Sequence, residues 1–158
     1  MAFSEKDFEY MRLALKEAEK AYKKGETPIG AVIVWEDEVI AKAHNLRESK
    51  KNALLHAECV AIDKACKKLG GWRLHKATLY VTLEPCPMCS GAIINSRIKR
   101  VVYGATDKKA GSCESVVNLF ELPYNHKPLV ESGLLAEDCQ SLLKDFFKEL
   151  RKNKTQNS

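Results

Sequence analysis

The sequence lacks any long hydrophobic run. No apolar stretch in its 158 residues approaches the roughly 18 residues that cross a bilayer. The first seven residues contain no apolar core of a secretory signal. Internal repeats, low-complexity tracts and a domain linker are also missing. These absences predict a cytoplasmic protein without a membrane partner, folded as a single domain over residues 1–152 with a flexible tail over residues 153–158.

The sequence also has few of the motifs that close a structural metal site. It contains six cysteines but a single Cys-x-x-Cys, at Cys86 and Cys89, and no His-x-x-x-His. A structural zinc ion needs four protein ligands, so the chain lacks the second motif that such a site requires. The other four cysteines are scattered, and we expect them to be reduced thiols: Cys59, Cys66, Cys113 and Cys139.

A third ligand is available in the segment His56-Ala57-Glu58. If each segment begins a helix, Cys86 and Cys89 share one face, and the helix N-terminus favours the thiolate that binds metal. One imidazole and two thiolates suit Zn²⁺ and leave a position for water, whose pKa zinc lowers to roughly 7. Glu58 is then free to accept and pass on a proton.

Each segment alone has a simpler interpretation. A Cys-x-x-Cys also fits a redox pair, and His-Ala-Glu also fits an ordinary helix start. Together, and with Pro85 before the first thiol, they match the signature H-x-E…P-C-x-x-C of the zinc nucleobase deaminases. We therefore predict a zinc-dependent hydrolytic deaminase.

Hydrophobic periodicity predicts an α/β fold. Ser4 is a suitable N-cap for a first helix whose apolar stripe is Phe8, Met11, Leu15, Ala18 and Tyr22. β-branched runs and further stripes predict strands at 29–35, 39–43, 77–83, 100–103 and 129–133, and helices at 56–69, 86–96, 116–122 and 137–152. Such alternation predicts a three-layer α/β/α sandwich around one central mixed five-stranded sheet, with both metal-binding segments at the same sheet edge.

Basic residues are in moderate excess. Lys and Arg number 26 against 21 Asp and Glu, which gives a formal net charge of +5. Several lie near the end of the last predicted helix, where they fit either phosphate contacts or a solvated helix terminus: Lys144, Lys148, Arg151, Lys152 and Lys154. Phe146 and Phe147 are adjacent, so we expect one in the core and the other free to stack on a base.

Several segments beyond the signature resemble the bacterial tRNA-specific adenosine deaminases, which have the cytidine deaminase-like fold. The similarity covers about Phe8 to Arg151, and its most specific segments are HAEC at 56–59, EPCPMCSGAIINSRIKRVVYGA at 84–105, TDKKAGS at 106–112 and LLKDFFKELR at 142–151. It implies conversion of adenosine to inosine at the first anticodon (wobble) position of a tRNA, typically an arginine tRNA. It also implies a homodimer with one Zn²⁺ per subunit and no DNA partner.

The resemblance also assigns residues by matching positions. His56, Cys86 and Cys89 match the zinc ligands, and Glu58 matches the proton shuttle. The matching substrate contacts are Asn45 to the purine, Ile29 against the base, Asp107 near the neighbouring ribose, and Phe146, Phe147 and Arg151 along the groove for the anticodon loop.

Two features depart from the family pattern. Asn52-Ala53-Leu54-Leu55 stands where Asp-Pro-Thr-Ala is common, and Cys59 stands where an aliphatic residue is usual. The spacing from Asn45 to His56 is kept, so we expect the metal geometry to be preserved, and the Leu54-Leu55 pair to alter the pocket wall or a dimer contact.

Two other functions fit part of the pattern. A deaminase of a free base or nucleoside, such as guanine or cytosine, would share the zinc site and the fold. An RNA-binding module with a structural zinc would need a fourth ligand and would leave Glu58 without a role. Without the resemblance, Asn45 fits a turn residue after a strand.

Overall fold

A computed structural model describes residues 2–156. Its centre is one sheet of five strands in the order β2-β1-β3-β4-β5: β1 (Gly30–Trp35), β2 (Glu38–His44), β3 (Ala77–Leu83), β4 (Arg100–Ala105) and β5 (Leu129–Ser132). β1 is antiparallel to β2 and β3, whereas β3, β4 and β5 run parallel. The prediction of a mixed five-stranded sheet is confirmed.

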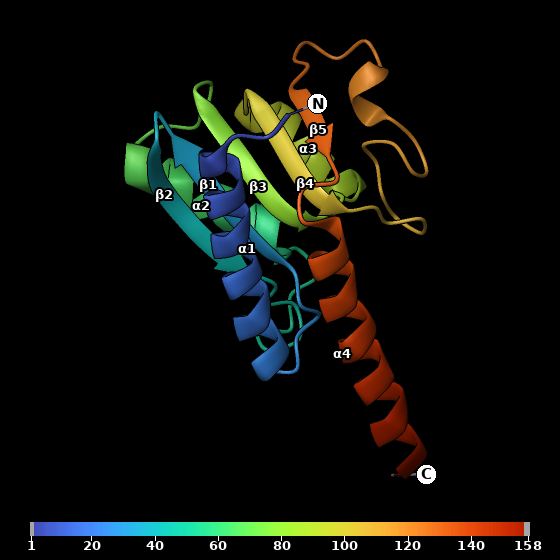
Figure 1. Ribbon diagram of the computed structural model, residues 1–158. Helices are drawn as coiled ribbons and strands as arrows, with labels where there is room; N and C mark the ends of the chain where they lie inside the picture. The colour runs from blue at the N-terminus through green and yellow to red at the C-terminus, as the bar shows by residue number, and fades with distance from the viewer. Residues whose placement is uncertain (1, 157–158) are drawn as a thin grey trace.

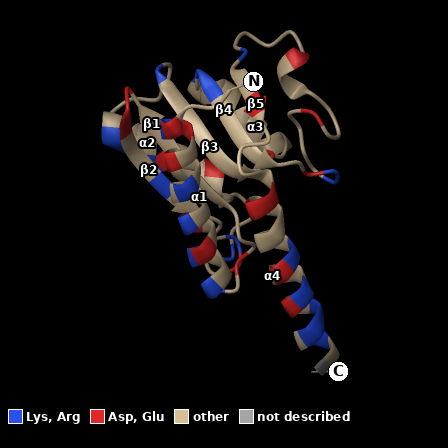
Figure 2. Ribbon diagram, viewed as in Figure 1, with Lys and Arg blue, Asp and Glu red and all other residues tan. Residues whose placement is uncertain are grey.

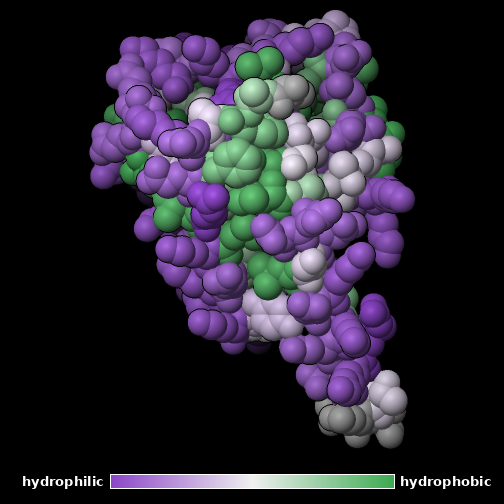
Figure 3. Space-filling model, viewed as in Figure 1, coloured by the Kyte–Doolittle hydropathy of each residue, from purple (hydrophilic) through white to green (hydrophobic). Residues whose placement is uncertain are grey.

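Helices cover both faces of the sheet. They are α1 (Glu5–Lys23), α2 (Ala57–Leu69), α3 (Pro87–Ser96) and α4 (Ala136–Gln156). Figure 1 shows α1 and α4 in front of the sheet and α2 and α3 behind it. Each face has its own hydrophobic cluster, and together they give the predicted α/β/α sandwich. Figure 3 shows hydrophobic side chains reaching the surface in a band between α1 and α4.

The first helix begins as predicted, but of its predicted stripe only Met11 and Ala18 are buried, while Phe8, Leu15 and Tyr22 are half-buried. Ser4 Oγ accepts a hydrogen bond from Asp7 N, and the Asp7 carboxylate accepts one from Ser4 N, which forms a capping box. The buried stripe contains Ala14 and Ala18, whereas the larger Leu15 is only half-buried. The reason is a close approach, because a Cβ on Gly30 of β1 would overlap the Ala14 carbonyl. Small residues therefore face the strand.

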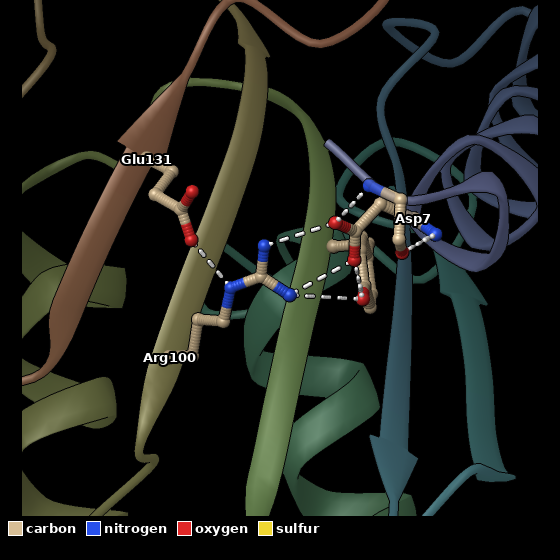
Figure 4. A network of polar contacts seen from close by, with 5 residues as sticks. Asp7, Arg100 and Glu131 are labelled. Carbon is tan, nitrogen blue, oxygen red and sulfur yellow. Dashed lines mark hydrogen bonds and ion pairs between the residues drawn. The ribbon is translucent and has the colours of Figure 1, made fainter. Parts of the chain in front are cut away.

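A polar network fixes α1 to the sheet (Figure 4). The Arg100 guanidinium on β4 donates from Nη1 and Nη2 to the Asp7 carboxylate at 2.9 and 3.1 Å, and from Nε to Glu131 on β5 at 2.6 Å. The Tyr80 hydroxyl on β3 donates to Asp7 at 2.6 Å. Asp7 is buried, and Arg100 beside it holds the pKa of its carboxyl well below the usual range.

Two expected helices differ in extent. Instead of a helix over 116–122, the structure has one turn of 3₁₀ helix, η1 (Leu119–Glu121), and the exposed Val116 supplies no buried stripe to extend it. α4 continues to Gln156, past the predicted end at Lys152, because residues 153–156 contain no Gly or Pro to stop it. The flexible tail over 153–158 stays a prediction, and residues 157–158 lie outside the described part of the chain.

The second half of α4 leaves the body of the protein. Figure 1 shows it projecting beyond the sheet, and Figure 2 shows that Lys and Arg dominate this part. Leu150 is exposed here. Across residues 2–156, no helix is both long enough and apolar enough to span a bilayer.

Candidate active site

The two predicted metal-binding segments come together at the carboxyl end of β3. His56 is the N-cap of α2, and Cys86 is the N-cap of α3, so both side chains project from the start of a helix. Cys89, one turn into α3, is completely buried. This arrangement is the one expected from the sequence, because a turn at Glu84-Pro85 separates β3 from α3.

The spacing of the three ligand atoms fits tetrahedral zinc. His56 Nδ1 lies 3.5 Å from Cys86 Sγ and 3.6 Å from Cys89 Sγ. Tetrahedral angles with the usual Zn–N and Zn–S bond lengths separate nitrogen and sulfur ligands by roughly 3.5–3.6 Å. Among the residues described, this is the group of His, Cys and acidic side chains whose donor atoms are close enough to share a metal ion.

Electrostatics distinguish Cys86 from the other two groups of the set. The hydrogen bond from the Cys89 thiol, followed by the contact with His56, lowers the pKa of Cys86 to about 4. Contact with Cys59 and Cys86 raises the pKa of Cys89. A thiolate beside an imidazole is a soft and borderline donor combination compatible with Zn²⁺.

Glu58 lies two residues after His56, in the first turn of α2, and is not one of the three metal-binding residues. Its side chain is only 4% exposed, and this burial raises the pKa of Glu58 to about 7. Such a carboxyl group can accept and release a proton near neutral pH. The structure thus gives Glu58 the environment of a proton carrier next to the metal-binding set.

A cavity of about 500 Å³ opens above these groups. Four of the predicted substrate contacts line it together with His56, Glu58 and Cys86: Ile29, Asn45, Asp107 and Phe147. Asn45 is buried, and its side-chain carbonyl oxygen Oδ1 has no hydrogen-bond partner. A buried acceptor without a partner is costly, so this oxygen is suited to a ligand that brings a donor.

The other two predicted contacts lie elsewhere. Phe146 is buried and packs edge-on against Tyr22 and Phe147, so it is the core member of the pair. Arg151 lines a separate groove on α4, next to Lys144 and Lys148, and not the cavity over Glu58. Phe147 is 41% exposed and lines both the cavity and the groove. The cavity and the groove therefore meet at Phe147.

The departures from the family pattern lie outside the lining of the cavity. Cys59 is half-buried, and its Sγ lies 3.7 Å from Cys89 Sγ. Leu54 is exposed, and Leu55 packs on the hydrophobic cluster behind the sheet. Neither leucine lines the cavity, so the predicted effect on the pocket wall is wrong and the effect on a dimer contact stays a prediction.

Two buried acidic residues near the cavity were not predicted from the sequence. Glu26 accepts hydrogen bonds from Glu48 N and from Ser49 N and Oγ, and Glu84 accepts hydrogen bonds from the segment after β4. Burial alone would raise the pKa of Glu84, but its hydrogen bonds to Ser115 and to backbone N–H groups lower it. For Glu84, the available signal was an acidic residue between the apolar run 77–83 and Pro85.

Comparison with known proteins identifies the family. A sequence model of the MafB19-like deaminases matches residues 5–151. A protein of Bacillus subtilis (strain 168) named tRNA-specific adenosine deaminase is 56% identical over 146 residues, which are 92% of this chain and 91% of that protein. One from Aquifex aeolicus (strain VF5) with the same name is 48% identical over 91% of this chain and 95% of its own length.

Comparison with solved structures supports the same family. A structure from studies of A-to-I editing by tRNA:A34 deaminases at the wobble position superposes with a TM-score of 0.84 and 46% identity, covering 85% of this chain and 99% of that chain. A guanine deaminase from Bacillus subtilis superposes with a TM-score of 0.63 and 35% identity, over 75% of this chain and 74% of that chain. Within the MafB19-like deaminases, the chain belongs to the family of tRNA-specific adenosine deaminases.

Proposed function

We propose that this protein deaminates adenosine to inosine at the first anticodon position of a tRNA, typically an arginine tRNA. The observation that carries the proposal is the placement of the buried Glu58 carboxyl group beside a His-Cys-Cys set, at the bottom of a cavity with an unpaired amide oxygen. Family membership supports the same reaction, because the relatives of similar length are tRNA-specific adenosine deaminases.

The residues divide the chemistry between them. His56, Cys86 and Cys89 would hold one Zn²⁺, which supplies the positive charge that makes water a nucleophile at neutral pH. Glu58 takes a proton from the attacking water and delivers protons to the ring nitrogen and to the departing amine. Water adds its oxygen to the purine carbon that carries the amino group, and ammonia leaves, so the products are inosine and ammonia.

The cavity can hold the base once it is turned out of the anticodon loop. Unpaired loop bases are accessible on their edges, unlike bases in an A-form helix. The Asn45 amide can accept from and donate to a purine edge, and its unpaired Oδ1 fits that role. Ile29 and Asp107 line the same cavity. In this proposal Ile29 offers an apolar surface to the ring, and Asp107 contacts the neighbouring ribose.

The groove on α4 continues from the cavity and suits the rest of the anticodon loop. Phe147 is exposed enough to stack on a base, while Lys144, Lys148 and Arg151 can contact phosphates. A free-base deaminase needs no such groove. This basic surface is therefore the feature that favours tRNA over a free base or nucleoside, the alternative represented by guanine deaminase.

We also propose that the protein works as a homodimer in the cytoplasm. Large hydrophobic side chains are exposed on its surface, and a second copy would cover part of them: Leu54, Trp72, Val116, Tyr124 and Leu129. Sedimentation of the purified protein tests the dimer, and a single monomer-sized species at micromolar concentration would contradict it.

The substrate assignment is tested by incubating the zinc-loaded protein with two sets of substrates. One is an arginine tRNA transcript with adenosine at the first anticodon position, and the other is free adenine, guanine, cytosine and their nucleosides. We expect inosine in the tRNA at that position only. Ammonia from a free base, with no inosine in the tRNA, would keep the deaminase chemistry and overturn the tRNA assignment.

A further inference from the structure

Glu84 is a buried carboxylate at the wall of the cavity, only 2% exposed. Every hydrogen bond that it accepts comes from the segment between β4 and η1. Oε2 accepts from the backbone N–H groups of Cys113, Glu114 and Ser115, at 3.1, 2.9 and 2.9 Å. Oε1 accepts from Asp107 N at 3.0 Å and from Ser115 Oγ at 2.5 Å. These five donors occupy all the hydrogen-bond acceptor positions of the Glu84 carboxylate.

The segment it holds forms one wall of the cavity. Residues 106–110 line the cavity together with Ile29 and Asn45. The Asp107 side chain accepts hydrogen bonds from Lys109 N and Ala110 N, so it shapes its own turn. We call residues 106–115 the wall loop.

The wall loop closes tightly around the carboxylate. Gly111 lies against Glu84, and a Cβ at Gly111 would overlap all three carboxyl atoms. Ser112 N donates to the carbonyl of Pro85 at 2.9 Å, next to the metal-binding Cys86. The loop is therefore fixed to the short segment that joins β3 to the metal-binding helix, and its position relative to Cys86 depends on Glu84.

We propose that Glu84 is a positioning residue for the substrate: through its five hydrogen bonds it holds the wall loop, and with it Asp107, at a fixed distance from the metal-binding set. The inference rests on the proposed function and adds a residue to it. Glu84 has no free oxygen lone pair facing the base, so it acts through the loop and not on the reacting atoms.

Glu84→Gln tests this with little change in volume. The glutamine oxygen is needed at the Oε2 position, where three backbone donors converge, so its NH₂ group faces Asp107 N. Two donors then oppose each other, and the Asp107 end of the loop loses its partner. Ser115→Ala removes only a hydroxyl donor from the same oxygen and leaves the bond to Asp107.

Gly111→Ala approaches the same carboxylate from the loop side. Its methyl group must displace Glu84, so it should reproduce the effect of Glu84→Gln without changing the carboxyl group. Gly71→Ala is the matched control, because a Cβ there meets no atom within 4 Å. The measurements are zinc per chain, kcat and KM for the tRNA transcript, and amide hydrogen exchange of residues 107–115.

We expect Glu84→Gln and Gly111→Ala to raise KM about tenfold, the scale of one unsatisfied buried amide. We also expect faster amide exchange in the wall loop, zinc content equal to that of the wild type, and nearly unchanged kcat. Ser115→Ala should have a smaller effect, and Gly71→Ala none. A raised KM with an unchanged kcat would not follow from a general loss of fold, because unfolding reduces the fraction of active protein and therefore lowers the apparent kcat.

Two results would overturn the proposal. One is unchanged KM and unchanged exchange in both Glu84→Gln and Gly111→Ala. The other is loss of zinc with a lower kcat and unchanged KM, which would mean that Glu84 supports the metal-binding segment instead. If the wild type deaminates only a free base, KM is measured for that base, so failure of the tRNA assignment and failure of the Glu84 assignment are separate results.

Discussion

The substitution Asp7→Asn should destabilise the protein more than the loss of any surface ion pair would, because Asp7 joins α1 to strands β3 and β4. Its two oxygens accept from Tyr80 and Arg100 on one side, and from Ser4 N and Arg100 on the other. An asparagine offers one oxygen and turns the other position into a donor. Whichever way it is oriented, two donors lose their acceptor, and Arg100 keeps only Glu131 as a charged partner.

The magnitude follows from burial. Breaking a fully buried pair by removing one partner costs about 3–5 kcal/mol. Here the Asp7 side chain is nearly buried, but the Arg100 side chain is 22% exposed, and water can replace part of the lost contact. We therefore expect a loss of about 2–3 kcal/mol in the free energy of unfolding at pH 7. For a domain of this size that lowers Tm by roughly 4–12 °C.

The dependence on pH identifies the charge as the cause. Because Arg100 depresses the pKa of Asp7 in the folded protein, the stabilisation is present above the unfolded pKa and is lost as pH falls through the folded one. Urea unfolding of wild type and Asp7→Asn should therefore show the full difference at pH 7. The difference should shrink progressively below about pH 4.

A matched control uses an exposed acidic residue. Asp37 pairs with Lys6 at 3.5 Å, and its side chain is 74% exposed. Asp37 has a positive φ, which asparagine tolerates, so Asp37→Asn should cost less than about 1 kcal/mol. Equal effects of the two substitutions, or a difference between wild type and Asp7→Asn that does not vary with pH, would refute the reasoning about the buried pair.

Three further predictions concern the site. Glu58→Gln should keep zinc at the wild-type level, measured by elemental analysis, while turnover falls by a factor on the order of 10²–10⁴ because the proton carrier is lost. Retained turnover would remove Glu58 from the reaction. Phe147→Ala should weaken tRNA binding about tenfold in a filter-binding titration at unchanged Tm, whereas Phe146→Ala should cost about 3 kcal/mol of stability; equal effects would contradict their separate roles. Chelation of the metal should abolish turnover and lower Tm, with both restored by Zn²⁺, because the three ligands join two helices; activity that persists without metal would contradict the zinc assignment.

The metal-binding set could be predicted because its signal is local. His56, Cys86 and Cys89 occur in two short motifs at helix N-termini, and the order of strands and helices brings those termini to one sheet edge. The alternation of apolar residues likewise predicted the five strands. The roles of His56, Cys86 and Cys89 in zinc binding, and of Glu58 in catalysis, stay predictions.

The contacts that hold the cavity walls could not be predicted in this way. Glu84 binds residues 23 to 31 positions later in the chain, and such contacts leave no periodicity in the sequence. The small residues of α1 face the sheet only because Gly30 allows the backbones to approach, which depends on the packing of two elements. Arg151 lines the groove on α4 together with Phe147, and its contact with the anticodon loop stays a prediction.

The central claim is that this cavity hydrolyses the amino group of a tRNA adenosine with a proton carried by Glu58. The most direct measurement is the mass of the nucleoside released from the arginine tRNA transcript after reaction in water labelled with heavy oxygen. The account predicts inosine at the first anticodon position that carries the heavy oxygen, formed by the wild type and not by Glu58→Gln. Unchanged adenosine in the tRNA, or inosine formed equally well by Glu58→Gln, would contradict it.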